Sequence, residues 1–225
     1  MPYAFPGFPA EGIAFLRSLK KNNRREWFQP RKEIYDEKVK APMVELITAL
    51  QRDMMAFAPH YTGDPSKLIY RLYRDTRFSN DKTPYKTHIA ASFPRRDAGK
   101  HAAAGFYFGV GSDEVQVAGG VYMPPVENLR AIREHVAGHH ERLRKIIANR
   151  TLRALVGDMH GQQLARAPKG YLPDHPAADL LRYKQFLFYV ELDAKLVTTP
   201  KVHGEVLKRF RAMTPFIEFL NEPFA

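Results

Sequence analysis

The sequence predicts an α+β fold in which an antiparallel sheet of about four to five strands has helices before and after it, packed mainly on one face. Two observations support this prediction. Apolar residues recur at helical spacing near both ends of the chain, and they alternate with a period of two between residues 68 and 121. The 225 residues include 44% hydrophobic residues and no repeat or Gly/Ser-rich linker. We therefore expect a single domain over residues 1–225.

Three helices are expected before the sheet. Apolar residues at positions 13, 16 and 19 predict a short first helix that ends at Asn22-Asn23. A second helix is expected over residues 31–40, because prolines bracket this stretch at positions 30 and 42. A third helix has Pro42 in its first turn, where a missing N–H is tolerated. Its apolar stripe consists of Met43, Leu46, Ile47, Leu50 and Met54.

The alternating runs predict a meander of strands with one buried face. They cover residues 68–74, 89–93, 104–110 and 115–121, and the turn signal Gly111-Ser112-Asp113 separates the last two. A further strand is expected over residues 186–192, where apolar residues again occupy every second position. Short connections favour antiparallel pairing for this sheet.

Helices return after Pro124-Pro125. The apolar spacing predicts one helix over residues 126–136, another around residues 143–147 and a third around residues 152–156. The final helix is expected to have Thr199 as its N-cap and Pro200 at its first position. Pro215 is expected to kink or restart this helix, because proline lacks the N–H that a helix interior needs.

The composition excludes several classes of protein. The chain has a formal net charge of +11 and no cysteine, which excludes disulfides, a thiolate nucleophile and a thiolate-bound metal. No apolar run approaches the ~20 residues of a membrane-spanning helix. The first nine residues include three prolines and lack the pattern of a secretory signal. We therefore expect a cytoplasmic protein with no membrane partner.

No metal site is expected. His135 and His139 are four residues apart, but they do not stand in the HExxH order, and Gly138 weakens the helix that would align them.

The densest cluster of polar residues lies between the first two expected strands, over residues 71–88. Arginine offers a planar fork of donors and lysine a compact charge, and both suit a phosphate or carboxylate group. A loop held between two strands would bring such side chains together around one anion. The predicted ligand-binding residues are Arg71, Arg74, Arg77, Lys82, Tyr85, Lys86 and His88.

Two carboxylates accompany these cations. Asp75 and Asp81 are candidate catalytic groups, because a carboxyl can act as acid or base or orient an arginine. The alternative is that each aspartate pairs with a neighbouring arginine and orders the loop. The sequence leaves both interpretations open.

Four residues outside this segment are candidates for a supporting role: Arg25, Gly120, Tyr122 and Lys169. Gly119-Gly120 within a strand indicates a bulge or the close approach of another backbone or a ligand. Lys169 lies at the tip of a predicted turn. Asn23 and Glu26 have the spacing of a capping box, while Trp27 and Phe28 are expected to be core anchors.

These residues resemble the signature of a widespread bacterial family, also present in fungi, of conserved proteins of unknown function. The central pattern is Arg71-x-x-Arg74-Asp75-x-Arg77-Phe78-x-x-x-Lys82-x-x-Tyr85. Other similar blocks are Asn22-Asn23-x-Arg25-Glu26-Trp27-Phe28, Lys32-x-x-Tyr35, Gly119-Gly120-x-Tyr122-x-Pro124, Pro168-Lys169-Gly170-Tyr171 and Asp174-His175-Pro176. The resemblance runs from about Ile13 to Leu220. It implies a single domain of this length and brings no established activity, cofactor or catalytic residue.

Two functions remain open at this stage. The first is a binding site, catalytic or not, for a small phosphate- or carboxylate-bearing ligand at residues 71–88. The alternative is a nucleic-acid-binding protein that uses the same basic surface and stacks bases on Tyr73, Phe78 and Tyr85. The sequence contains no helix-turn-helix, zinc-finger or RNP signature, and net charge alone supports only nonspecific attraction.

Overall fold

The computed structural model describes residues 5–96 and 103–224 and confirms the α+β fold class. Four strands form one antiparallel sheet in the order β1-β2-β3-β4. These strands are β1 (Ile89–Phe93), β2 (Gly105–Val110), β3 (Glu114–Val121) and β4 (Phe186–Asp193). All four agree with expected runs, because their apolar residues alternate and therefore reach one face of the sheet.

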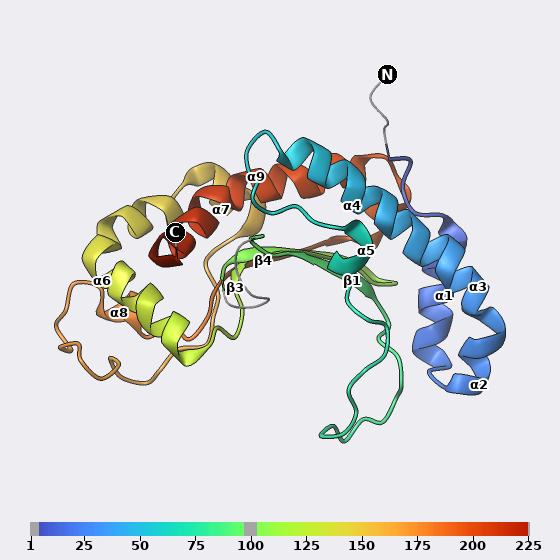
Figure 1. Ribbon diagram of the computed structural model, residues 1–225, viewed down its shortest axis with the longest axis horizontal. Coiled ribbons are helices and arrows are strands. Elements are labelled where there is room, and N and C mark those ends of the chain that lie inside the picture. Colours follow the sequence, from blue (N-terminus) through green and yellow to red (C-terminus); the bar gives the residue numbers. More distant parts are fainter. Residues whose placement is uncertain (1–4, 97–102, 225) are drawn as a thin grey trace.

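Helices precede and follow the sheet, as Figure 1 shows. The preceding helices are α1 (Ala10–Lys21), α2 (Arg25–Phe28), α3 (Lys32–Tyr35), α4 (Ala41–Met54) and α5 (Pro65–Leu68). Between β3 and β4 lie α6 (Val126–Ile147), α7 (Arg150–Val156) and α8 (Ala178–Leu181), and α9 (Lys201–Asn221) follows β4. Among the described residues, no helix has both the length and the apolar character needed to cross a bilayer.

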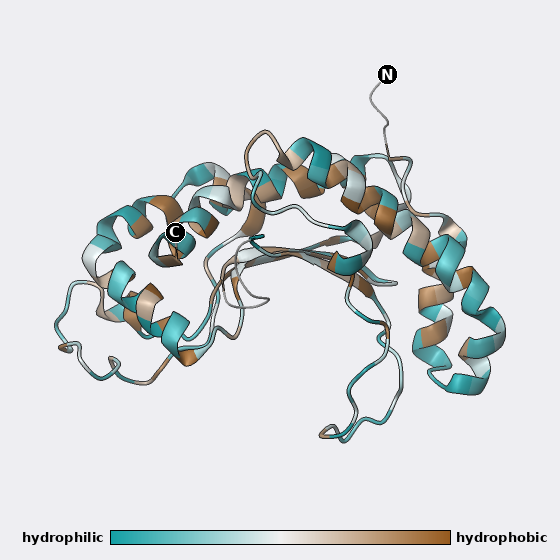
Figure 2. Ribbon diagram, in the orientation of Figure 1, coloured by the Kyte–Doolittle hydropathy of each residue, from teal (hydrophilic) through white to brown (hydrophobic). Residues whose placement is uncertain are grey.

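One face of the sheet forms the core of the molecule. Alternate residues of every strand, including Phe93, Phe108, Val117 and Phe188, are fully buried on this face. Helix α9 packs directly on β3, where a side chain at Gly119 would come within 2.9 Å of Ile217. The opposite face is not covered by α4 or α9, so helices pack mainly on one side (Figure 1). Figure 2 shows the brown apolar surfaces of these two helices turned toward the sheet.

The strand expected over residues 68–74 is wrong. Residues 65–68 form the short helix α5 instead, because Asp64 accepts a hydrogen bond from the Ser66 N–H and Pro65 occupies the first turn. Beyond α5 the chain makes only isolated bridges, from Ile69 to Ala91 and from Tyr73 to Tyr85. Residues 71–86 therefore leave the sheet as a projecting pair of extended segments, which we call the arm (Figure 1).

One expected helix boundary before the sheet also differs from the structure, whereas the division expected after the sheet is present. The helix expected over residues 31–40 does not end before Pro42, because a π-helical turn (Asp36–Lys40) carries the chain into α4. Pro42 lies in the first turn of α4, within a run of helical backbone that continues from α3 through this π-helical turn. The helices expected near residues 126–136 and 143–147 both lie within α6, and non-helical dihedral angles at His139 divide α6 by a kink into two helical parts, in agreement with the prediction.

The start of α9 is shifted by one residue from the prediction. Thr199 donates its hydroxyl to the Leu196 carbonyl instead of capping the helix, and Pro200 is the N-cap. Helix α9 continues through Pro215 to Asn221, so this proline does not restart it. The neighbouring Phe216 and Ile217 are fully buried, and their packing holds the helix across the missing hydrogen bond.

Candidate functional site

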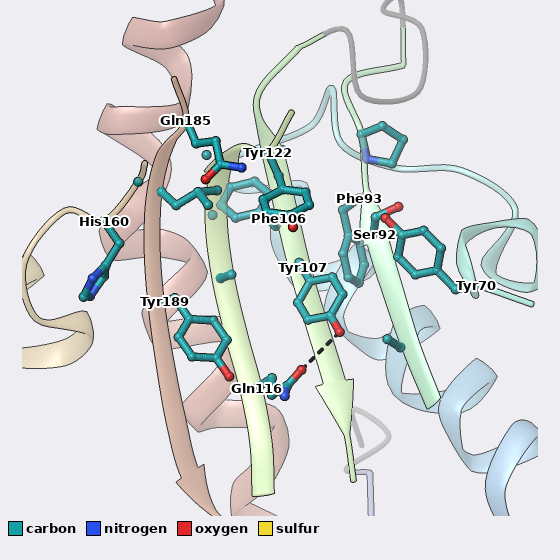
Figure 3. Close-up of a pocket in the computed structure, with 18 of the residues that line it drawn as sticks. Tyr70, Ser92, Phe93, Phe106, Tyr107, Gln116, Tyr122, His160, Gln185 and Tyr189 are labelled. Atoms are coloured by element: carbon teal, nitrogen blue, oxygen red, sulfur yellow. Dashed lines mark hydrogen bonds between the residues drawn. The ribbon is translucent and has the colours of Figure 1, made fainter. Parts of the chain in front are cut away.

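The uncovered face of the sheet contains a hollow of about 880 Å³. Its floor includes one row of residues that crosses all four strands, because the register pairs Ser92 with Tyr107, Tyr107 with Ala118, and Ala118 with Tyr189. Neighbouring strands are ~4.8 Å apart, so the two tyrosines stand roughly 10 Å apart with the small Ala118 between them. Figure 3 shows both rings on this face of the sheet.

Hydrogen bonds fix the two floor tyrosines. The Tyr107 hydroxyl donates to Gln116 Oε1 at 3.2 Å (Figure 3). The Tyr189 hydroxyl donates to Glu191. Tyr107 lies over Gly109, where a Cβ atom would come within 2.9 Å of its hydroxyl. Burial raises the pKa of Tyr107 to about 12 and also raises the pKa of Tyr189. Both phenols are therefore neutral hydrogen-bond donors at physiological pH.

The β1 side of the hollow carries its positive charge. Lys86 is the only Lys or Arg among the described residues that line the hollow, and its Nζ lies 5.2 Å from the centre of the Tyr70 ring. His88 also lines the hollow, and burial, assisted by Lys86, lowers its pKa. The imidazole is therefore neutral at pH 7 and offers one donor and one acceptor.

The remaining residues predicted for the anion site lie on the arm and do not line the hollow. Backbone hydrogen bonds join the two segments of the arm, from Lys86 N to Leu72 O at 2.8 Å and from Arg74 N to Pro84 O at 2.9 Å. Lys82 Nζ donates to the Thr76 carbonyl at 2.9 Å across the far end. The arm is therefore ordered by bonds within itself. In Figure 2 it is mainly hydrophilic.

Each aspartate of the arm is paired with an arginine. Asp75 accepts hydrogen bonds from the Arg77 guanidinium, at 2.8 Å for Nη2, and from the Arg77 backbone N–H. The hydrogen bonds from Arg77 lower the pKa of Asp75 to about 2. Asp81 accepts from the Thr83 N–H at 2.9 Å and from Arg74, and these bonds lower its pKa to about 2. Both carboxyls are ionised at neutral pH.

Asn23 attaches the base of the arm to the first helices. Its Nδ2 donates to the Tyr85 carbonyl at 2.8 Å, and its Oδ1 accepts from the Tyr85 N–H at 3.0 Å. The expected capping box is therefore wrong, because the N-cap of α2 is Arg24 and the Asn23 amide is occupied by Tyr85. The Tyr85 side chain is only 1% exposed, with its ring centre 4.3 Å from that of Phe28.

The four supporting candidates divide between the hollow and other places. Gly120 and Tyr122 line the hollow. Gly120 has a φ of +130°, and a Cβ there would come within 2.0 Å of the Phe186 carbonyl oxygen, so a neighbouring backbone accounts for this glycine. Arg25 lies on α2, near enough to Tyr85 to oppose the rise in pKa that burial causes in that phenol. Lys169 lies in the segment between α7 and α8 and does not line the hollow.

Sequence reasoning missed several residues of the hollow. Tyr70, Tyr107, Gln116, Tyr189, His160 and Gln185 all line it. A usable signal was present for the strand residues, since the positions that alternate with the core residues carry tyrosine and glutamine. His160 and Gln185 come from connecting segments, and no local pattern marks them.

A family model described as a conserved hypothetical protein (DUF2461) matches residues 11–219. This match confirms the expected resemblance to a family of conserved proteins of unknown function. No curated protein matches the chain.

Proposed function

We propose, for a chain that belongs to the DUF2461 family of conserved hypothetical proteins, that the hollow on the open sheet face binds a small molecule with a ring and an anionic group. The observation that carries this proposal is the presence of Tyr107, Tyr189 and Lys86 in one hollow. Its volume of about 880 Å³ lies within the roughly 300–1,000 Å³ of small-ligand sites.

The two floor tyrosines support binding of a ring. They stand on either side of Ala118, whose methyl group leaves the space between them open. Aromatic faces attract planar rings and the apolar faces of sugars. The O–H groups of both phenols are engaged by Gln116 and Glu191, so each phenol oxygen can accept a hydrogen bond from a ring N–H or hydroxyl. An aromatic or sugar ring seated over Ala118 would contact both side chains.

Lys86 supports binding of a phosphate or carboxylate at the β1 side. Its ammonium group lies at the edge of the same hollow, and the neutral His88 beside it can donate one hydrogen bond. The exposed arginines of the arm add a positive field that raises the local concentration of anions. We assign Asp75 and Asp81 to ordering the arm, because each is ionised and paired with an arginine.

The proposal is tested by thermal shift and calorimetry with a panel of ring-containing phosphates and carboxylates, with AMP as reference and adenosine and inorganic phosphate as its two halves. A ligand at ~100 times its Kd stabilises the protein by about 2.7 kcal/mol. Lys86→Met keeps the apolar stem and removes the charge, so it should weaken AMP binding at least tenfold and leave adenosine binding unchanged.

Two controls complete the experiment. Lys201→Met removes an exposed lysine from the start of α9, on the covered side of the sheet, and should bind every probe as the wild type does. Tyr107→Ala should weaken adenosine and AMP alike. The proposal fails if no member of the panel stabilises the wild type, or if Lys86→Met and Lys201→Met have equal effects.

A further inference from the structure

The far end of the arm exposes an aromatic side chain that the fold does not use. Phe78 is 95% exposed, the highest value among the large hydrophobic residues described. Burying a phenylalanine shifts the folding equilibrium toward the folded state by about 10- to 150-fold, and a fully solvated one contributes nothing to the core. A single exposed apolar residue is ordinary on a protein surface, so the significance of Phe78 depends on the charged groups beside it.

Phe78 belongs to one chain of contacts with two exposed arginines. The Arg77 guanidinium lies 5.7 Å from the centre of the Phe78 ring and pairs with Asp75, and Arg71 approaches the same carboxylate at 3.9 Å. The side chains of Arg71 and Arg77 are 70% and 77% exposed. One carboxylate thus holds two guanidinium groups in place and leaves an excess of positive charge beside the aromatic ring.

The geometry points to single-stranded nucleic acid as the partner, and we propose that the arm binds it through Phe78 at its far end and the linked charges of Arg71, Asp75 and Arg77. Arginine matches phosphate with two parallel hydrogen bonds, and a base can stack on the free face of Phe78. The net charge of +11 favours the encounter. This surface is separate from the hollow, so the inference does not depend on the small-ligand proposal.

Other partners fit this surface less well. A membrane-binding segment needs a broad apolar face, whereas the arm presents one phenylalanine among charged groups. A stable protein partner needs about 800 Å² of contact on each side with an apolar centre, which a narrow polar arm does not provide. Of the aromatic residues expected to stack bases, Tyr73 is exposed but Tyr85 is buried, so Phe78 is the main stacking residue.

Fluorescence anisotropy with a labelled mixed-sequence 20-nucleotide DNA strand at ~50 mM salt tests this inference. Phe78→Ala should weaken binding about tenfold, in the range expected for one lost base–aromatic stack, and Phe78→Trp should restore it. Arg77→Ala should weaken binding and reduce the slope of affinity against salt by about one. Neither change should lower the melting temperature by more than a degree, because Phe78 lies in water and the Arg77–Asp75 pair is exposed and orders only the arm.

Two matched controls distinguish this site from diffuse charge. Arg130→Ala removes an arginine that is 81% exposed and paired with Glu134, as Arg77 is paired with Asp75. Val126→Ala shortens an apolar side chain that is 84% exposed on the same helix. Both variants should bind within twofold of the wild type. The inference is overturned if the strand does not bind, if Phe78→Ala has no effect, if Arg130→Ala equals Arg77→Ala, or if only anionic lipid vesicles bind through Phe78.

Discussion

Replacing Asn23 with alanine should loosen the arm while the rest of the fold stays intact. The variant removes both hydrogen bonds between the Asn23 amide and the backbone of Tyr85, at 2.8 and 3.0 Å. A hydrogen bond in a folded protein contributes about 0.5–1.5 kcal/mol net, so the two bonds together contribute about 1–3 kcal/mol. Because Tyr85 is buried, water replaces these bonds poorly, and the loss should lie toward the upper end of this range.

Hydrogen exchange of the Tyr85 amide measures this loss directly. A change of 1.4 kcal/mol corresponds to a factor of ten, so exchange at Tyr85 should accelerate by about 5- to 150-fold in Asn23→Ala. Asn23→Asp is a sharper variant, because its carboxylate still accepts from the Tyr85 N–H but cannot donate to the Tyr85 carbonyl. Exchange in Asn23→Asp should therefore be intermediate.

Asn22→Ala is the matched control for this change. The Asn22 side chain donates to the Ser18 carbonyl of α1 at 3.0 Å, whereas the Asn23 side chain bonds the arm. Exchange at Tyr85 should be unchanged in this variant. If Asn23→Ala also leaves the Tyr85 amide as protected as in the wild type, the arm is held by its other contacts and the reasoning is wrong.

Three further predictions concern a buried amide, the two carboxylates of the arm and a glycine with a positive φ. Asn221→Leu should destabilise the protein by about 2–5 kcal/mol in urea denaturation, because the fully buried Asn221 amide bonds both the N–H and the carbonyl of Ala104. Acidification should loosen the arm, and NMR signals of the arm measure this change. The pKa values of Asp75 and Asp81 are lowered to about 2. The stabilisation that these two carboxylates give the arm is therefore complete above pH ~4 and is lost as the pH falls toward 2. Gly120→Ala should destabilise the sheet by at least about 1–3 kcal/mol in the same urea assay, because its φ is +130°.

Each of these predictions has a specific control. Gly138→Ala meets no atom within 4 Å and should be neutral or slightly stabilising, so an equal loss in both glycine variants would contradict the steric argument. Asn221→Leu is contradicted if the urea midpoint stays within error of the wild type. The acid prediction is contradicted if the whole protein unfolds before signals of the arm change, since the two carboxylates then do not control it.

The sheet could be predicted from the sequence because its signal is local. In β1 to β4 every second residue is apolar, and a strand with one buried face requires that pattern. The same pattern misled for residues 68–74, where Asp64 and Pro65 start a helical turn and the following residues have only isolated bridges to pair with. Alternation indicates an extended chain, and it does not decide whether a neighbouring strand is in reach.

The candidate site was only partly predictable, because its residues meet through contacts between distant parts of the chain. Asn23 and Tyr85 are 62 positions apart, and the local spacing of Asn23 and Glu26 predicted a cap instead. The cross-strand row that brings Tyr107 to Tyr189 depends on the register of three strands. Both tyrosines do occupy the polar positions of the predicted strands, so the alternation pattern predicts their place on the uncovered face of the sheet.

The two ends of the basic segment, residues 71–88, lie in different parts of the fold. At its base, Lys86 is held by its backbone bond to Leu72 and by the neighbouring contact of Asn23 with Tyr85, and its side chain enters the hollow. At its far end, Arg77 and Phe78 face solvent and do not line the hollow. Charge density alone could not separate these roles, because the separation arises from the extended arm between them. Lys86→Met and Phe78→Ala should therefore affect different ligands, and a variant at Asn23, which holds the base, should weaken the small ligand more than the nucleic acid.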